Sequence, residues 1–541
     1  MQPQKIDERF HIPIILFFSL LLFYFNLGGL AFVGPDEPRY AQVAREMFER
    51  RDFVTPTLLG HTWFEKPVLL YWLMMGCYKI FGVNEWAARF PNATLATISL
   101  LLVYIVASRA ANKSIALWSS LSLATSALYL GLARAASFDM PLTFTFTLAL
   151  LLFYLADVEE VATKKKLYMS GFYAAVGLAL LAKGLVGPVL ITAIVLLYLL
   201  LSGQIKKGFC YYPFAGSLIV LLVASIWYWP VIAKHQWLFI DEFFIQHHFQ
   251  RYTSNKYRHP GPIYYFLLIV SAGIFPWTLF LIVQLSTNIK KMLESFRSKP
   301  LFGKYETAFD KLQLLAFCWI LVPLLFFSFS GSKLPGYILP IFPALGLIVG
   351  YKLDQISTTQ SNQLVRVTAI FLIIFGGGLG YFAGKELNAT PTAQFALLGL
   401  SIVIAIGMFI VRLKPLLLFS PLLAVLISLL LFPGIEYDSS IAPLSKRAAI
   451  ELRPEEEIIF FNSLEYAPFF YTNGRIVKDK DGKEVVAVSR DEIVAHLASR
   501  SSLLCIMRSR HLEMLDGDSR FRIEKIDSQR TFVLLRLTSS R

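Results

Sequence analysis

Residues 12–40 are IPIILFFSLLLFYFNLGGLAFVGPDEPRY, and the change from apolar to charged within this stretch sets the kind of fold to expect. The apolar part, 12–33, is long enough to cross about 30 Å of hydrocarbon as a helix. No small-residue cleavage site precedes the charged part, so we expect an uncleaved first membrane span. Asp36 and Glu37 then lie between two prolines at what would be the membrane surface.

Similar apolar runs recur along the chain. Of its 541 residues, 56% are hydrophobic, and near-continuous apolarity is what contact with lipid requires. We therefore expect a polytopic α-helical membrane protein with about thirteen transmembrane helices. The predicted spans lie near 12–33, 87–108, 114–132, 138–156, 169–183, 186–203, 212–233, 263–287, 312–330, 335–351, 366–384, 393–411 and 415–433. For the two spans around Lys183, a single broken helix is the alternative.

Alternate loops are basic, which predicts an orientation. If the N-terminus is cytoplasmic, the inner loops hold the basic residues within 109–113, 164–166, 206–207, 290–311, 352 and 412–414. Cytoplasmic loops of membrane proteins carry this excess of Lys and Arg. The external loops are then 34–86, 133–137, 234–262, 331–334 and 385–392. With an odd number of spans, the C-terminal part is external as well.

The composition changes near residue 434. Residues 1–433 form the predicted membrane domain, whereas 434–541 have the strand, helix and hairpin patterns of a small soluble α/β domain. This second domain has 17 Lys+Arg and 17 Asp+Glu, so the net charge of +14 belongs to the membrane domain. That distribution favours anionic headgroups or phosphate ligands over nucleic acid as partners.

Charged groups gather in the long external loops. The first loop holds Asp36 and Arg39, followed by Glu65 and Lys66, and we expect interfacial helices over 41–51 and 65–82. The alternative for its charged residues is that they only solvate a loop. In the later loop, His248 and Arg251 are three residues apart and would share a helix face. Imidazole binds metals and Arg binds phosphate, but from this spacing alone interfacial hydrogen bonding is the favoured interpretation of both residues.

Four further residues stand at the edges of predicted spans. Lys333 and Tyr337, in GSKLPGYILP, would place a cation and a phenol at the outer surface. A lysine that extends toward the headgroups and a tyrosine of the aromatic belt are the structural alternative. Asp139, in FDMP, and Lys183, in AKG, are ionisable groups where burial is costly, which is typical of functional positions.

Taken in order, the motifs PDEPRY, FEKPVLLYW, FDMP, AKG, HHFQRY and GSKLPGYILP resemble those of a known family. They are similar to the polyprenyl-phosphate-dependent glycosyltransferases of the GT-C superfamily, and most closely to the bacterial lipid A 4-amino-4-deoxy-L-arabinose transferases. Protein O-mannosyltransferases share the pattern more distantly. The resemblance implies a multi-pass protein of the bacterial inner membrane with its active site and C-terminal domain on the periplasmic side. It also implies an inverting transfer from a polyprenyl-phosphate sugar donor to lipid A or another envelope acceptor.

The resemblance also implies roles for particular residues. Asp36 and Asp139 would be the catalytic carboxylates. Glu65 and His248 would hold a divalent metal, for which the resemblance suggests zinc. The residues implied to contact the donor or line the cavity are Arg39, Lys66, Lys183, Arg251, Lys333 and Tyr337. Position 63 departs from the family, because Trp63 stands where a tyrosine is usual, and a phenolic donor to phosphate is lost there.

Several alternatives stay open at this point. If the acceptor is a hydroxyl, Asp36 must act as a general base, whereas an acceptor phosphate is already anionic and needs none. A hydroxyl acceptor would belong to a protein or a glycan, as for the O-mannosyltransferases. A membrane transporter is the alternative from another class, but no internal repeat supports it. We expect a monomer among membrane lipids.

Overall fold

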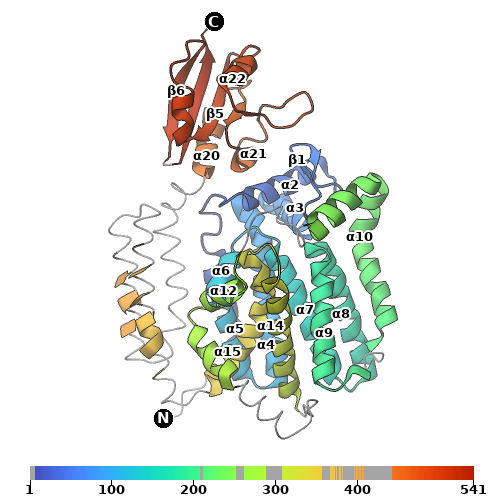
Figure 1. The fold of residues 1–541 in the computed structure, drawn as a ribbon. Helices are drawn as coiled ribbons and strands as arrows, with labels where there is room; N and C mark the ends of the chain where they lie inside the picture. The colour runs from blue at the N-terminus through green and yellow to red at the C-terminus, as the bar shows by residue number, and fades with distance from the viewer. Residues whose placement is uncertain are drawn as a thin grey trace.

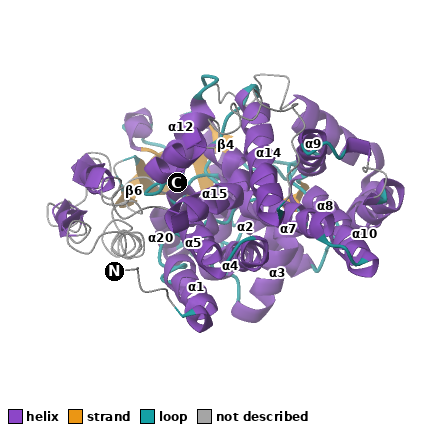
Figure 2. Cartoon of the chain, turned by 90° about the horizontal axis from the view of Figure 1, so that it is seen from below, coloured by secondary structure: helices purple, strands orange, loops and turns teal. Residues whose placement is uncertain are grey.

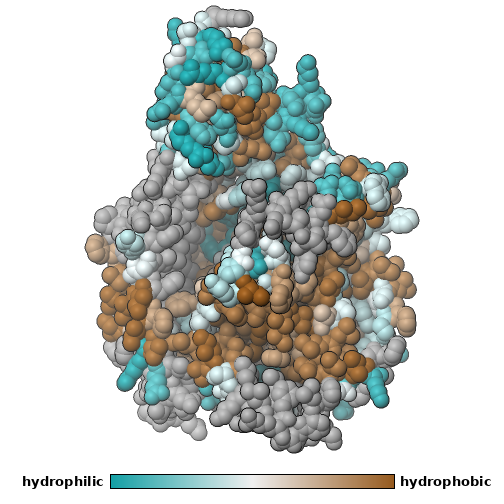
Figure 3. Space-filling view, viewed as in Figure 1, coloured by the Kyte–Doolittle hydropathy of each residue, from teal (hydrophilic) through white to brown (hydrophobic). Residues whose placement is uncertain are grey.

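The computed structural model describes residues 7–206, 211–250, 261–287, 307–355, 441–529 and 531–540, with scattered helical positions between 363 and 406. Side chains of 247–250 are not included in this description. Two parts are visible: a helical bundle and, above it, a small domain built on a sheet (Figure 1). The surface of the bundle is largely hydrophobic and that of the small domain largely hydrophilic (Figure 3).

The bundle contains most of the described helices. Seen from below, α8, α9 and α10 form one side and α4, α5, α7, α14 and α15 the centre (Figure 2). Apart from α10, these helices share one continuous apolar cluster as their core. The helices are α1 (His11–Ser19), α4 (Glu85–Ala110), α5 (Lys113–Ala124), α6 (Ala127–Ala133), α7 (Asp139–Val158), α8 (Ala162–Lys183), α9 (Val186–Leu201), α10 (Pro213–Phe239), α12 (Tyr265–Gly273), α14 (Ala308–Ser328) and α15 (Phe342–Gln355). Short 3-10 or π segments are η1 (Glu8–Phe10), η2 (Leu20–Tyr24), η4 (Ile240–Gln250) and η6 (Pro335–Ile341).

Within the described residues, five helices are long and apolar enough to cross a membrane, or up to seven if each of two bent pairs is one span. The bends are 67° between α5 and α6 and 117° between α12 and a helix over Thr278–Thr287. The chain is therefore a multi-pass membrane protein. Of the remaining predicted spans, 366–384 and 393–411 are described only at scattered helical positions, and 415–433 lies wholly outside the described residues. Around Lys183 the structure has two separate helices, α8 and α9, which pack against each other, so the single broken helix is excluded.

The first predicted span is shorter than its apolar run. Helix α1 continues into η2 and ends at Tyr24, and Asn26 has a positive φ of 51°. A helix from 11 to 24 reaches only about 21 Å. The carbonyls of Leu27, Leu30 and Ala31 instead accept hydrogen bonds from the Arg89 guanidinium, which a continuous helix would not allow. The prediction of a helix through residue 33 is therefore wrong.

The segment predicted to be the first external loop, 34–86, forms the top of the bundle (Figure 1). It contains α2 (Asp36–Arg50), the short strands β1 (Thr57–Leu58) and β2 (His61–Thr62), and α3 (Leu69–Phe81). Two helices were expected here, but α2 begins five residues earlier than predicted. Proline is tolerated in the first helical turn, and carboxylates there are stabilised by the helix dipole. Asp36 and Glu37 therefore start a helix rather than a loop. The later loop predicted over 234–262 is also partly helical, since α10 and η4 continue to Gln250.

The C-terminal domain has the predicted α/β composition. Its five-stranded sheet has the order β4-β3-β5-β7-β6, with β3 parallel to β4 and β5 and the terminal hairpin antiparallel. The elements are α20 (Ala442–Glu451), β3 (Ile458–Phe461), α21 (Ala467–Tyr471), β4 (Val486–Ala487), α22 (Arg490–Leu497), β5 (Ser502–Arg508), η8 (Ser509–Met514), β6 (Phe521–Ser528) and β7 (Phe532–Ser539). One face of the sheet packs against α22.

The opposite face of the sheet joins the C-terminal domain to the bundle. Phe460 and Leu504 of the sheet lie in the same buried apolar cluster as Val43 and Met47 of α2 and Met74 of α3. Helices α20 and α21 lie directly above α2 and α3 (Figure 1). The two domains therefore share one hydrophobic core at the end of the bundle that holds α2 and α3.

Candidate functional site

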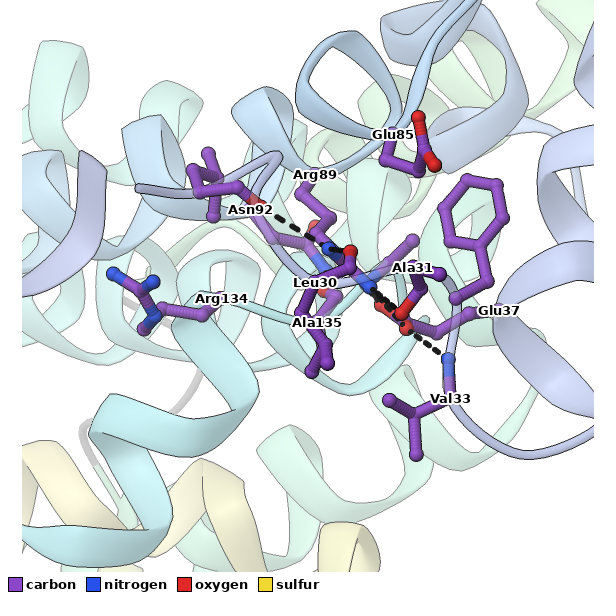
Figure 4. A network of polar contacts seen from close by, with 12 residues as sticks. Leu30, Ala31, Val33, Glu37, Glu85, Arg89, Asn92, Arg134 and Ala135 are labelled. Atoms are coloured by element: carbon purple, nitrogen blue, oxygen red, sulfur yellow. Dashed lines mark hydrogen bonds and ion pairs between the residues drawn. The ribbon is translucent and has the colours of Figure 1, made fainter. Parts of the chain in front are cut away.

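The two neighbouring carboxylates of PDEPRY have different environments. The Asp36 side chain is 55% exposed, whereas that of Glu37 is 10% exposed. Glu37 accepts two hydrogen bonds from the Arg89 guanidinium at 2.8 and 3.0 Å, and others from the backbone N–H groups of Val33 and Ala136 (Figure 4). Burial raises the pKa of Glu37, but Arg89 and these hydrogen bonds outweigh it and hold the pKa below its usual range. Glu37 therefore fixes the fold and leaves Asp36 available for chemistry.

Asp36 belongs to a cluster of alternating charges. Arg39 Nη2 donates to Asp36 Oδ1 at 2.5 Å and lies 3.4 Å from Glu65 Oε2. Lys66 Nζ donates to the other oxygen of Glu65 at 2.8 Å. The predicted residues of PDEPRY and FEKP are thus brought together, with Glu65 facing a cation on each oxygen.

Aromatic rings surround Arg39. The ring centroids of Tyr40, Trp63 and Tyr466 lie 5.4, 5.5 and 5.2 Å from its Cζ. Two buried donors at this place, Arg39 Nε and Trp63 Nε1, have no hydrogen-bond partner in the described structure. A buried unsatisfied donor costs about 1–3 kcal/mol, so this position favours an acceptor atom. The indole N–H of Trp63 supplies a donor where the family's phenol is missing.

Asp139 and Lys183 form a second cluster. Lys183, the last residue of α8, donates to the carboxylate of Asp139, the first residue of α7. Lys183 Nζ also lies 5.0 Å from the centroid of the Tyr337 ring. The segment that carries Tyr337 can lie this close to Asp139 because residue 336 is glycine. A Cβ at that position would overlap the Asp139 carboxylate. Three predicted site residues from three distant segments therefore meet.

Phe138 connects the two clusters. Its ring lies 4.9 Å from that of Tyr40 and 5.1 Å from that of Tyr71. Phe138 precedes Asp139, while Tyr40 is one helical turn after Asp36. The aromatic contact holds the start of α7 against α2, so both carboxylates lie at the same end of the bundle. Figure 3 shows hydrophilic surface within a recess below the C-terminal domain.

Of the other predicted residues, Lys333 is placed differently from the expectation, and two fall outside the description. Lys333 is 8% exposed and its Nζ donates to the Ser330 carbonyl at 2.6 Å, so the expectation of a cation at the outer surface is wrong. The same contact excludes the snorkelling alternative for Lys333, because its ammonium group is bonded within the protein. His248 lies in η4, with its side chain outside the described residues, and Arg251 lies wholly outside them.

The described residues give limited support to a metal. They contain no group of three or more His, Cys, Asp or Glu side chains that could hold one. Both oxygens of Glu65 face cations, which competes with metal binding. The His248 side chain needed to complete the predicted pair is not among them.

Sequence reasoning missed Arg89 and Tyr466. Arg89 is a charge inside a predicted span, which is the same signal that singled out Lys183. Tyr466 carries no comparable signal, because only the docking of the C-terminal domain places it beside Arg39.

Comparison with known proteins supports the fold. A family model described as dolichyl-phosphate-mannose-protein mannosyltransferase matches residues 65–229, which contain Glu65, Lys66, Asp139 and Lys183. The undecaprenyl phosphate-alpha-4-amino-4-deoxy-L-arabinose arabinosyl transferase of Pectobacterium atrosepticum is 30% identical over 382 residues, 70% of this chain and 65% of that protein. That of Pectobacterium carotovorum is 30% identical over 68% of this chain and 63% of its own length. The matched part thus spans less than two thirds of these relatives.

Solved structures extend the likeness to nearly the whole chain. ArnT from Cupriavidus metallidurans, bound to undecaprenyl phosphate, superposes with a TM-score of 0.78 at 23% identity and covers 97% of both chains. The archaeal oligosaccharyltransferase AglB from Archaeoglobus fulgidus gives a TM-score of 0.52 at 12% identity, over 93% of this chain and 70% of that one. The chain therefore has the fold of these transferases, and its sequence is similar to the undecaprenyl phosphate-alpha-4-amino-4-deoxy-L-arabinose arabinosyl transferases.

Proposed function

We propose that the protein transfers a sugar, of the aminoarabinose type, from a polyprenyl-phosphate donor to lipid A on the periplasmic face of the inner membrane. The observation that carries the proposal is the meeting of carboxylates and cations from PDEPRY, FEKP, FDMP and AKG at one end of the bundle. The similarity to the aminoarabinose transferases supports the choice of donor and acceptor. The basic inner loops support the periplasmic side.

The proposed reaction makes one bond and breaks one. An acceptor oxygen attacks the anomeric carbon of the sugar, and the bond between that carbon and the lipid phosphate breaks. The leaving phosphate takes the electron pair and gains negative charge. Among the described residues, Arg39 pairs with Asp36 and Lys66 pairs with the neighbouring Glu65. The positive charges of Arg39 and Lys66 would stabilise the leaving phosphate oxygen. The unpartnered N–H groups of Arg39 and Trp63 would bind the same phosphate.

The acceptor decides what Asp36 does. A lipid A phosphate is already anionic, so Asp36 and Asp139 would position the acceptor or bind the ammonium group of an amino sugar. A hydroxyl acceptor, as for the protein O-mannosyltransferases, would require Asp36 to accept its proton. Because the aminoarabinose transferases are the more similar relatives over the longer stretch, we favour the phosphate.

A metal remains part of this proposal. Glu65 and His248 would hold a divalent cation, which would add positive charge near the donor phosphate. Chelation of the purified protein should then lower activity, and Glu65→Gln should do the same. Unchanged activity in both cases would remove the metal from the mechanism.

The test is transfer by the purified full chain in lipid nanodiscs. Polyprenyl-phosphate aminoarabinose and lipid A are supplied, and mass spectrometry detects the modified lipid A. Asp36→Asn is expected to lower turnover by about 10²-fold or more if Asp36 acts on the proton, and less if it only positions the acceptor. Glu49→Gln, which changes an exposed carboxylate of the same helix, is the matched control. Full activity of Asp36→Asn would refute the catalytic role, and transfer only to protein hydroxyls would refute the lipid A acceptor.

A further inference from the structure

The C-terminal domain contributes one side chain to the charged cluster of the bundle. Of the three described rings around Arg39, Tyr40 and Trp63 come from segment 34–86, whereas Tyr466 comes from the turn between β3 and α21. Its centroid, at 5.2 Å from Arg39 Cζ, is the nearest of the three. A guanidinium over an aromatic face is attracted to the ring, and more strongly when water is excluded.

Arg39 is the residue through which this contact would act. Its Nη2 holds the Asp36 carboxylate at 2.5 Å, and its Nε is buried without a partner. The planar guanidinium fixes the directions of all its N–H groups together. The ring that orients the plane therefore determines where the Nε donor points and where Asp36 is held.

Docking of the C-terminal domain holds Tyr466 in place. Close to it in sequence, the Tyr471 hydroxyl accepts from the backbone N–H of Phe32 and donates to Glu85, both at 3.0 Å. Arg45 donates to the Phe470 carbonyl at 2.9 Å, and the rings of Phe470 and Phe32 are 4.9 Å apart. These contacts fix α21 on the bundle without touching Asp36 or Arg39.

We propose that Tyr466 is a positioning residue for the transfer reaction, through which the docked C-terminal domain sets the orientation of Arg39 toward the donor phosphate. This inference rests on the proposed function. It makes the C-terminal domain part of the donor site rather than a cap on the membrane domain.

Tyr466→Ala, Tyr466→Phe and Tyr471→Phe separate the ring from the docking. The full chain in nanodiscs is titrated with undecaprenyl phosphate, and KM for the sugar donor and kcat are measured in parallel. Tyr466→Ala is expected to weaken undecaprenyl phosphate binding and to raise KM by about tenfold. Tyr466→Phe should behave like the wild type because the ring remains. Tyr471→Phe loses two docking hydrogen bonds but keeps all three rings around Arg39, and should bind within about twofold of the wild type.

A double variant isolates the route through Arg39. In an Arg39→Met background, Tyr466→Ala should have no additional effect, because the coupled partner is already absent. Wild-type binding and KM in Tyr466→Ala, or the same loss in Tyr471→Phe, would overturn the inference. If the wild type transfers no sugar while Tyr466→Ala still weakens undecaprenyl phosphate binding, the proposed function fails and the role of Tyr466 in phosphate binding stands.

Discussion

Asp36 and Glu37 are adjacent carboxylates in the first turn of one helix, and their surroundings give them opposite roles. Asp36 is half-exposed and pairs with Arg39, its one ion-pair partner among the described residues, whereas Glu37 is buried against Arg89. The Arg89 guanidinium in turn satisfies the carbonyls of Leu27, Leu30 and Ala31. Glu37 thus anchors the helix on which Asp36, the proposed catalytic carboxylate, is carried.

Replacement of Glu37 should therefore lower stability. Glu37→Gln leaves Arg89 as a buried charge without its counter-ion, which costs about 3–5 kcal/mol. Thermal unfolding of the detergent-solubilised protein measures the loss, and Glu49→Gln, at an exposed ion pair, should change it by less than about 0.5 kcal/mol. Equal unfolding temperatures for the two variants would contradict the assignment.

The same pair predicts an acid sensitivity. The folded pKa of Glu37 is lowered, so its stabilisation is present above the unfolded pKa of about 4.3 and is lost as the pH falls through the folded value. Wild-type stability should decrease in that acid range, and Glu37→Gln should show a smaller decrease. An identical pH profile for the two proteins would exclude Glu37 as a contributor.

At the scale of elements, η6 meets the start of α7 and the end of α8. Gly336 in η6 lies against the Asp139 carboxylate, and Tyr337 lies over Lys183. The absence of a side chain at position 336 therefore lets η6 approach the ion pair. Only the packing of three helices from distant parts of the chain creates this contact.

Gly336→Ala should disturb the ion pair. A methyl group there overlaps the Asp139 carboxylate and must displace either Asp139 or η6, so we expect sugar transfer to fall by about tenfold or more. Gly76→Ala, in α3 with open space around its Cβ, should be tolerated. A steady-state transfer assay compares the two, and normal activity of Gly336→Ala would show that the Asp139–Lys183 geometry is not needed.

At the scale of the whole molecule, the two domains share an apolar core and a polar rim. Glu85 at the start of α4 accepts from Tyr471 at 3.0 Å and pairs with Lys446 of α20 at 2.8 Å. The boundary predicted near residue 434 lies outside the described residues, and the described parts on either side of it pack into one continuous apolar cluster.

Glu85→Gln should loosen the docking without unfolding either domain. Loss of the charge weakens the contact to Lys446, so backbone amides of α21 should exchange with solvent faster. Hydrogen exchange read by mass spectrometry checks this, with Asp491→Asn, at an exposed pair inside the C-terminal domain, as the control. Unchanged exchange in α21, or faster exchange throughout the sheet, would contradict it.

The sequence by itself determined the fold class and the composition of the site. Runs of apolar residues allow only spanning helices, because backbone groups in lipid must be bonded within the segment. The change in composition near residue 434 and the strand patterns that follow it likewise predicted the C-terminal sheet. Most of the charged side chains that meet in the two clusters come from the motifs PDEPRY, FEKP, FDMP and AKG. Ionisable groups beside membrane spans are costly, so they usually mark functional positions.

Tertiary structure decided which of these groups are partners. The early end of the first helix, the burial of Glu37 and of Lys333, and the place of Tyr466 beside Arg39 depend on contacts between residues tens to hundreds of positions apart. Local patterns carry no information on such contacts. A charged side chain can remain in water or be buried with a distant partner, and the residues next to it in sequence are the same in both cases. Which charged side chains are removed from water depends on how the helices and the C-terminal domain pack, and therefore only on the tertiary structure.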